Sequence, residues 1–152
     1  MNIDRARAAD HDAAFAIAQE YFDAIDVVVR DDYDEVRAYF DDPAGMWLAR
    51  DDDGAVVGCI VLRPLPSPEA ACEIKRMYVR DGFRGRGIAR ALLDAAHAHA
   101  RAHRFRWIYL DTKDDLPIAI AFYERRGYER CARYNDNPQA TIFMRRSLAV
   151  PD

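Results

Sequence analysis

The residues Arg84-Gly85-Arg86-Gly87-Ile88-Ala89 place two glycines and two arginines in one short turn. A strand-like run ends before it at Val79, and a helical spacing of apolar residues begins at Ile88. Glycines allow close approach of a ligand to the backbone, and the first amides of a helix have no carbonyl partner within that helix. Such amides bind anions together with the helix dipole, and arginines add positive charge. The turn therefore predicts a phosphate-type site; a plain glycine turn with solvated arginines is the alternative.

The elements before this turn are predicted from periodicity and from turn residues. Asp10 and the pair Asp31-Asp32 are suited to cap helices, and the run from Asp51 to Gly54 is typical of a hairpin turn. We expect strands at 3–7, 46–50, 55–62 and 71–79, with helices at about 10–25 and 32–40.

The strand 71–79 leads directly into the glycine turn, so its two faces matter most. Strict alternation predicts two sets of side chains, with Ile74, Arg76 and Tyr78 on one face and Glu73, Lys75, Met77 and Val79 on the other.

The elements after the turn are a helix at 87–103 and a strand at 106–112. Strand, helix and strand in this order predict a crossover that places the two strands parallel. Pro117 fits the first turn of another helix, which ends at Gly127. The segments 128–134 and 141–148 then form a closing antiparallel pair around the loop 135–138.

The composition indicates one soluble domain over residues 1–152, with 51% hydrophobic and 32% charged residues. A net charge of −4 argues against a nucleic-acid partner, and no apolar run approaches about 18 residues, so we expect no membrane span. Cys59, Cys72 and Cys131 have no paired spacing, which favours a reducing, cytoplasmic setting. The oligomeric state stays open, with a homodimer among the options.

Three histidines crowd the helix 87–103. His97, His99 and His103 have i, i+2 and i+6 spacing, which does not place all three on one face. We therefore expect packed or solvated histidines and no metal site.

With this element order and turn, the chain from about Ile3 to Leu148 resembles the GCN5-related N-acetyltransferase superfamily. The acetyl-CoA signature of that family, Arg or Gln, two residues, Gly, one residue, Gly or Ala, matches Arg84 to Ala89. A second family pattern matches Ala119, Tyr123, Gly127 and Tyr128. The resemblance implies an α/β fold with a mixed, mostly antiparallel sheet, helices on its faces and strands that splay at the cofactor site.

The resemblance also implies roles for individual residues around acetyl-CoA, with no metal. Tyr123 would protonate the leaving thiolate as a general acid, and Glu73, eleven residues before Arg84, would remove the proton from the amine. Glu73 as a strand glutamate paired with an arginine is the alternative. The other expected contacts are backbone pairing of the pantetheine arm with Met77, Tyr78 and Val79, and pyrophosphate binding by Arg84, Gly85, Arg86, Gly87, Ile88, Ala89 and Arg90.

The expected function is acetyl transfer from acetyl-CoA to a primary amine of a small molecule or amino acid, by direct attack in a ternary complex. Expected acceptor-lining residues are Tyr21, Arg76, Asp111 and Tyr134. Leu116 occupies a position where many family members carry asparagine, which motivates an alternative, a catalytically weak CoA-binding sensor or assembly module. A dinucleotide site ranks third because the turn lacks a third glycine.

Overall fold

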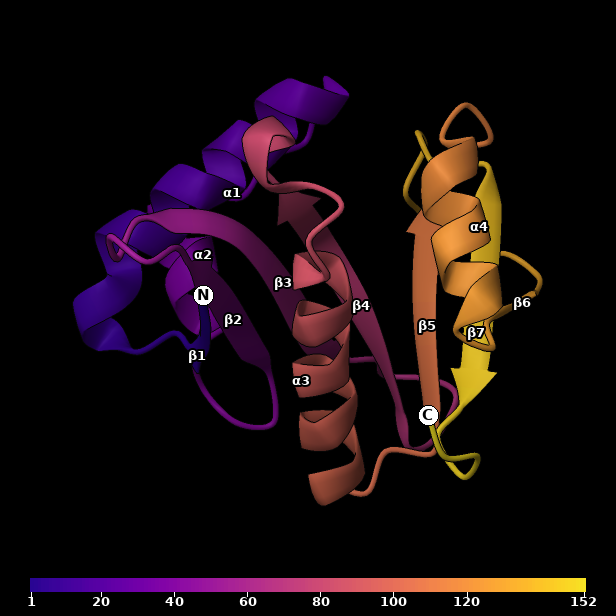
Figure 1. The fold of residues 1–152 in the computed structure, drawn as a ribbon. Coiled ribbons are helices and arrows are strands. Elements are labelled where there is room, and N and C mark those ends of the chain that lie inside the picture. Colours follow the sequence, from indigo (N-terminus) through magenta and orange to yellow (C-terminus); the bar gives the residue numbers. More distant parts are fainter.

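The computed structural model describes residues 1–152, which form one seven-stranded sheet with helices on both faces (Figure 1). The strands lie in the order β1-β2-β3-β4-β5-β7-β6, and every neighbouring pair is antiparallel except β4 and β5. The predicted mixed α/β sheet and its parallel crossover are thereby confirmed. The strands are β1 (Asn2–Arg5), β2 (Gly45–Arg50), β3 (Val56–Pro64), β4 (Ala71–Val79), β5 (Trp107–Thr112), β6 (Glu129–Arg130) and β7 (Ile142–Ser147); the helices are α1 (His11–Ile25), α2 (Tyr33–Ala38), α3 (Ile88–Ala102) and α4 (Pro117–Arg125).

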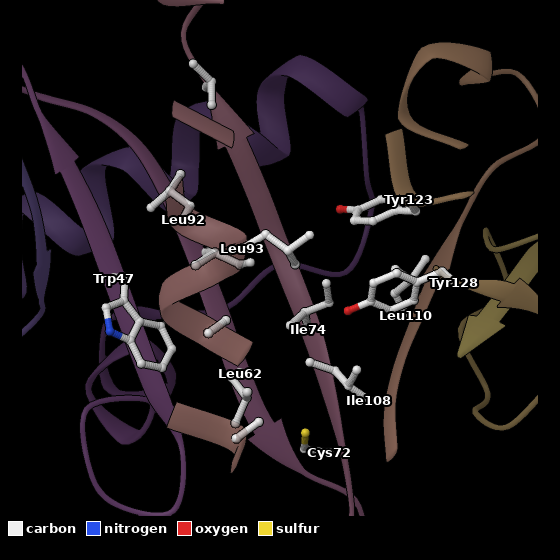
Figure 2. Packing of buried hydrophobic residues seen from close by; sticks show 14 of the residues in the cluster. Trp47, Leu62, Cys72, Ile74, Leu92, Leu93, Ile108, Leu110, Tyr123 and Tyr128 are labelled. Carbon is white, nitrogen blue, oxygen red and sulfur yellow. The ribbon is translucent and has the colours of Figure 1, made fainter. Parts of the chain in front are cut away.

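Each face of the sheet carries its own hydrophobic cluster. On one face, Phe22 of α1 and Val36 of α2 pack with Met46 and Leu48 of β2. On the other, α3 and α4 pack against the sheet in the cluster of Figure 2, which includes Leu92, Leu93, Ile74, Ile108, Tyr123 and Tyr128. No helix combines the length and the apolarity that crossing a membrane requires.

The strict alternation predicted for β4 is wrong beyond Lys75. Ile74 and Val79 both belong to the cluster under α3, although five residues separate them, while Tyr78 packs against the cluster under α1. Arg76 has φ +56°, and the β3–β4 register shifts between Cys59 and Val61. One extra residue in a strand exchanges its two faces, so this irregularity turns Met77 and Val79 toward α3.

β4 and β5 part after three residue pairs. Ala71, Cys72 and Glu73 pair with Trp107, Ile108 and Tyr109, after which β5 pairs only with β7. The rest of β4 pairs only with β3, and Figure 1 shows the two ribbons diverging from this point. The predicted splay is confirmed, and it leaves one edge of β4 open from Ile74 onward.

The two expected helix caps differ in the structure. The expected cap at Asp31-Asp32 is confirmed, because Asp32 caps α2 in a reciprocal capping box with Glu35. Asp10 makes no cap hydrogen bond to α1, because its carboxylate accepts from the Arg7 amide and pairs with Arg50.

The predicted strand 128–134 shortens to β6. Arg133 there turns to donate to the carbonyls of Asn135, Asn137 and Ala140 instead of continuing a ladder.

Candidate active site

The glycine turn joins β4 to the N-terminus of α3. Gly85 and Gly87 have φ +78° and +80°, a backbone region that glycine adopts without strain. A Cβ at either position would meet no atom within 4 Å, so conformation rather than crowding calls for glycine. Gly87 is the N-cap of α3 and offers no side-chain cap, which leaves the first helix amides of Ile88, Ala89 and Arg90 free of a capping side chain.

The arginines of the turn have different surroundings. Arg84 donates from Nε to the Val79 carbonyl at 2.9 Å and pairs with Asp81 at 2.6 Å, so it organises the turn. Arg86 lies over the Phe83 ring at 5.1 Å, and Arg90 is 3.9 Å from Asp94. Arg86 and Arg90 are exposed, and they leave the mouth of the turn positively charged.

A cavity of about 680 Å³ lies where β4 and β5 part. It reaches from Tyr21 on α1, across β4 and β5, to α4 and the loop 134–140. Its wall contains Glu73, Met77 and Tyr123 together with Tyr21, Arg76, Asp111 and Tyr134. The structure thus brings both expected catalytic residues and all four expected acceptor residues into one cavity.

Tyr123 occupies the α4 side of this cavity. Its ring is buried against Phe122 and Tyr128, and Figure 2 shows its hydroxyl directed toward β4. Burial, and then the nearby Tyr21 and Asp111, raises the pKa of Tyr123 above its usual range. The phenol therefore stays protonated at neutral pH, the state that a proton donor requires.

Glu73 lies at the last position of β4 that pairs with β5 and is 1% exposed. One carboxylate oxygen accepts from Arg63 Nε at 2.6 Å, and the other accepts from the Tyr134 hydroxyl at 2.8 Å. Arg63 is the cross-strand partner of Glu73 in the β3–β4 register. An ionised carboxylate has about four lone-pair sites, so both oxygens keep capacity for a further donor.

Of the other expected acceptor residues, Arg76 and Asp111 are hydrogen-bonded within the protein, whereas Tyr21 contacts Tyr78 through its ring. Arg76 lines the cavity, but Asp31 holds its guanidinium through two bonds of 3.0 and 3.1 Å. Asp111 accepts from the side-chain amides of Asn135 and Asn137, so it fixes the loop 135–140 at the rim. Burial raises the pKa of Tyr21 to about 12, and its ring faces Tyr78 edge-on.

Lys75 also lines the cavity, although it was not among the residues expected there. It lines the wall and makes no hydrogen bond or ion pair within the protein. Burial first, and then the positive charges of Arg76 and Arg63, lower the pKa of Lys75 to about 8. Its place two residues after Glu73 in a strand was the available signal, because such residues share a face.

Comparison with known proteins adds three findings on sequence. The sequence profile described as "Acetyltransferase (GNAT) family" matches residues 12–128. An uncharacterised N-acetyltransferase of Schizosaccharomyces pombe is 30% identical over 105 residues, which are 68% of this chain and 64% of that protein. The uncharacterised N-acetyltransferase YjgM of Escherichia coli is 35% identical over 97 residues, 63% of this chain and 58% of that protein. The chain therefore spans about three fifths of the length of these relatives.

Solved structures share the fold across nearly the whole chain. An acetyltransferase of the GNAT family from Staphylococcus aureus superposes with a TM-score of 0.84 at 21% identity, covering 97% of this chain and 98% of the other. A GNAT-superfamily phosphinothricin acetyltransferase from Sinorhizobium meliloti, solved in complex with AcCoA, gives a TM-score of 0.77 at 20% identity, covering 96% and 87%.

Proposed function

This chain belongs to the acetyltransferase (GNAT) family, and from that premise we propose that it transfers an acetyl group from acetyl-CoA to the primary amine of a small molecule. One observation carries the proposal. The cavity at the splay of β4 and β5 holds a protonated phenol, a carboxylate and an open strand edge within one wall.

The donor would lie along the open edge of β4 and end at the turn before α3. Along Met77, Tyr78 and Val79, the edge of β4 that faces β5 has no strand partner, so its free backbone groups can hydrogen-bond the amides of the pantetheine arm, as an added strand would. The amides from Gly85 to Ala89 would bind the pyrophosphate, with Arg86 and Arg90 beside it. Arg84 would act indirectly, because its guanidinium is engaged by Val79 and Asp81.

The chemistry follows from direct attack in a ternary complex. Glu73, through a bound water, accepts a proton from the acceptor ammonium, and the resulting amine attacks the thioester carbonyl. A C–N bond forms as the C–S bond breaks, and the nitrogen then releases its second proton through the same water to solvent, which also takes the first proton from Glu73. Tyr123 gives its proton to the departing thiolate and is reprotonated from solvent. Arg63 and Tyr134 would orient the Glu73 carboxylate throughout.

The acceptor would also carry an anionic group, such as the carboxylate of an amino acid. Among the cationic side chains of the cavity, Arg63 is paired with Glu73 and Arg76 with Asp31, while Lys113 donates to the Ile25 carbonyl. Lys75 alone has no partner. Lys75 is half-buried, so its unpaired ammonium is partly desolvated, and a carboxylate at hydrogen-bond distance would offset that cost. Glu73 and Lys75 together would then bind the two ends of an amino acid.

A thiol-release assay with matched acceptors tests this proposal. Each amino acid is compared with its primary amide, which keeps the amine and loses the charge. We expect kcat/KM to favour the acid by at least about tenfold, and Lys75→Gln to abolish this preference with little effect on the amides. Equal kcat/KM for an amino acid and its amide would contradict the proposed anionic group of the acceptor, but not the acetyl transfer.

A different result of the same assays would contradict the acetyl transfer itself. Tight acetyl-CoA binding in calorimetry with no turnover of any amine would favour the CoA-binding sensor. One observation favours this second function: both Glu73 oxygens already accept a hydrogen bond, one from Arg63 and one from Tyr134.

A further inference from the structure

Two histidines and an aspartate meet at the end of α3 farthest from the glycine turn. His99 and His103 are four residues apart, and their rings stack with centroids 4.0 Å apart. Asp42, in the segment between α2 and β2, approaches with Oδ2 at 3.5 Å from His103 Nε2. One ligand atom from each of the three residues lies within 4.8 Å of the others. We propose that Asp42, His99 and His103 form a site for a divalent transition metal ion, with Zn²⁺ as the best fit.

The expectation that the histidines of this helix form no metal site rested on treating three of them together. The structure separates them, because His97 is buried and bonds the Tyr128 hydroxyl at 2.8 Å and Asp152 at 3.0 Å. The remaining pair has i, i+4 spacing, which does share a helix face. The third ligand comes from a segment more than 50 residues earlier, so no local pattern in the sequence reveals it.

Neighbouring groups orient each of the three side chains. The His99 ring packs edge-on against Trp47 at 5.1 Å. His103 Nδ1 lies 3.0 Å from the His99 carbonyl and can only donate to it, which leaves the lone pair of Nε2 facing Asp42. Such outer hydrogen bonds fix the tautomer of a ligating histidine.

Arg5 holds the segment that carries Asp42. Its Nη2 donates to Asp42 Oδ1 at 2.6 Å and to the carbonyls of Phe40 and Ala44 at 3.3 and 2.9 Å. The bond to Oδ1 leaves Oδ2 directed at His103. The guanidinium also reduces the attraction of the carboxylate for a second cation, so we expect a moderate affinity rather than a tight one.

The donor set selects the class of metal. Two imidazoles and one carboxylate suit Zn²⁺ and neighbouring transition metals, whereas Mg²⁺ and Ca²⁺ prefer oxygen ligands alone. His99 Nε2–H donates to the Pro43 carbonyl at 3.0 Å, so His99 must release this proton or bind the ion through Nδ1, and a water can complete a tetrahedron. Ligand atoms of such a site stand ~3.3 Å apart, so a closure of up to ~1.5 Å is needed, and the exposed Asp42 and His103 side chains have room for it.

The consequence of binding would be stability rather than catalysis. The metal would join α3 to the segment that leads into β2, across the 56 residues that lie between Asp42 and His99. The 15 residues of α3 span ~22 Å, which separates this site from the anion turn at the other end of the helix.

Thermal unfolding of the untagged chain tests the site. With Zn²⁺ at ~100-fold excess over its Kd, we expect the Tm to rise by ~5 °C, and equal Mg²⁺ to leave it unchanged. In titration calorimetry, His103→Gln should weaken Zn²⁺ binding at least ~10-fold, as should Asp42→Asn. His11→Gln is the matched control, since His11 lies on α1 and stacks on Tyr33.

The proposal is overturned if His103→Gln and His11→Gln bind Zn²⁺ as the natural chain does. An NMR measurement on the natural chain tests the site even if a variant does not fold. Zn²⁺ should shift the imidazole nitrogen resonances of His99 and His103 and leave those of His97 and His11 in place. Shifts at His11 or His97 instead would equally remove the assignment.

Discussion

At the scale of single residues, Tyr123 has the environment of an acid and no competing structural bond. Its hydroxyl makes no hydrogen bond within the protein, and burial holds its pKa above the usual range. We expect Tyr123→Phe to lower kcat by ~10²-fold with little change in acetyl-CoA affinity, because one proton donor is removed and no donor contact is lost. Thiol release and calorimetry measure the two quantities separately.

Tyr33→Phe is the control for this experiment, because Tyr33 lies on α2 and its hydroxyl bonds the exposed Asp12. It should retain full turnover. Undiminished activity of Tyr123→Phe would mean that water protonates the thiolate.

The proposed roles of Tyr123 and Glu73 come from the family resemblance, and the alternative expectation that Glu73 pairs with an arginine is confirmed by Arg63. Which arginine pairs with it, and the contact with Tyr134, could not be predicted. Arg63 meets Glu73 because the β3–β4 register places them opposite each other. A connection of six residues between these strands, rich in proline, does not fix that register in the way a two-residue hairpin does. Tyr134 reaches Glu73 from a loop after β6, a contact that depends on the folded sheet.

At the scale of elements, the turn before α3 depends on a backbone conformation. Gly87→Ala should lower acetyl-CoA affinity ~10-fold and the free energy of unfolding by about 1 kcal/mol, because a left-handed residue with a Cβ is strained. Calorimetry and urea unfolding measure the two effects.

Gly54→Ala provides a matched control, since Gly54 has φ +84° in the β2–β3 turn and equally open surroundings. It should cost similar stability and leave donor affinity intact. Equal loss of affinity in both variants would show that strain alone is responsible.

Helices and strands could be predicted because their apolar periodicities are long and because glycine, proline and aspartate mark their ends. β4, for example, begins and ends where predicted, at Ala71 and Val79. The face on which each β4 side chain lies beyond Lys75 could not be predicted, because nothing in the residue types indicates a positive φ at Arg76. Asp31, in the segment between α1 and α2, bonds the Arg76 guanidinium, so this irregularity is supported by a tertiary contact.

At the scale of the molecule, the segment after β7 folds back onto α3 and β7. The Asp152 carboxylate bonds His97, Arg101 and the buried Arg146. Burial alone would raise the pKa of Asp152, but hydrogen bonds from Arg101 and His97 hold it well below its usual range. We expect Asp152→Asn to lower the free energy of unfolding by about 1 kcal/mol at pH 7, a modest value because the carboxylate is partly exposed.

The pH dependence of this loss has a definite sign. A carboxyl with a depressed folded pKa contributes stability that is complete above its unfolded pKa of ~3.9 and disappears as the pH falls toward the folded value. The difference between the natural chain and Asp152→Asn in urea unfolding should therefore be constant from pH 7 to ~5 and shrink below ~4. A difference that does not shrink at all between pH 5 and ~2 would assign the effect to packing.

The overall sheet was predictable because hairpins and one crossover leave few topologies open. The position of Asp42 beside His103 and the loop 135–140 over the cavity were not, because each results from side chains that meet only after the sheet has assembled.

The short β4–β5 pairing divides the molecule into two halves, β1–β4 and β5–β7, that share only three residue pairs of backbone ladder. If acetyl-CoA lies in the gap, it takes the place of the missing ladder and is bound by the folded chain alone. The ratio of unfolded to folded protein then falls by the factor 1 + [L]/Kd. Under the proposed function, the lifetime of this protein in a cell would follow the supply of the metabolite that it consumes.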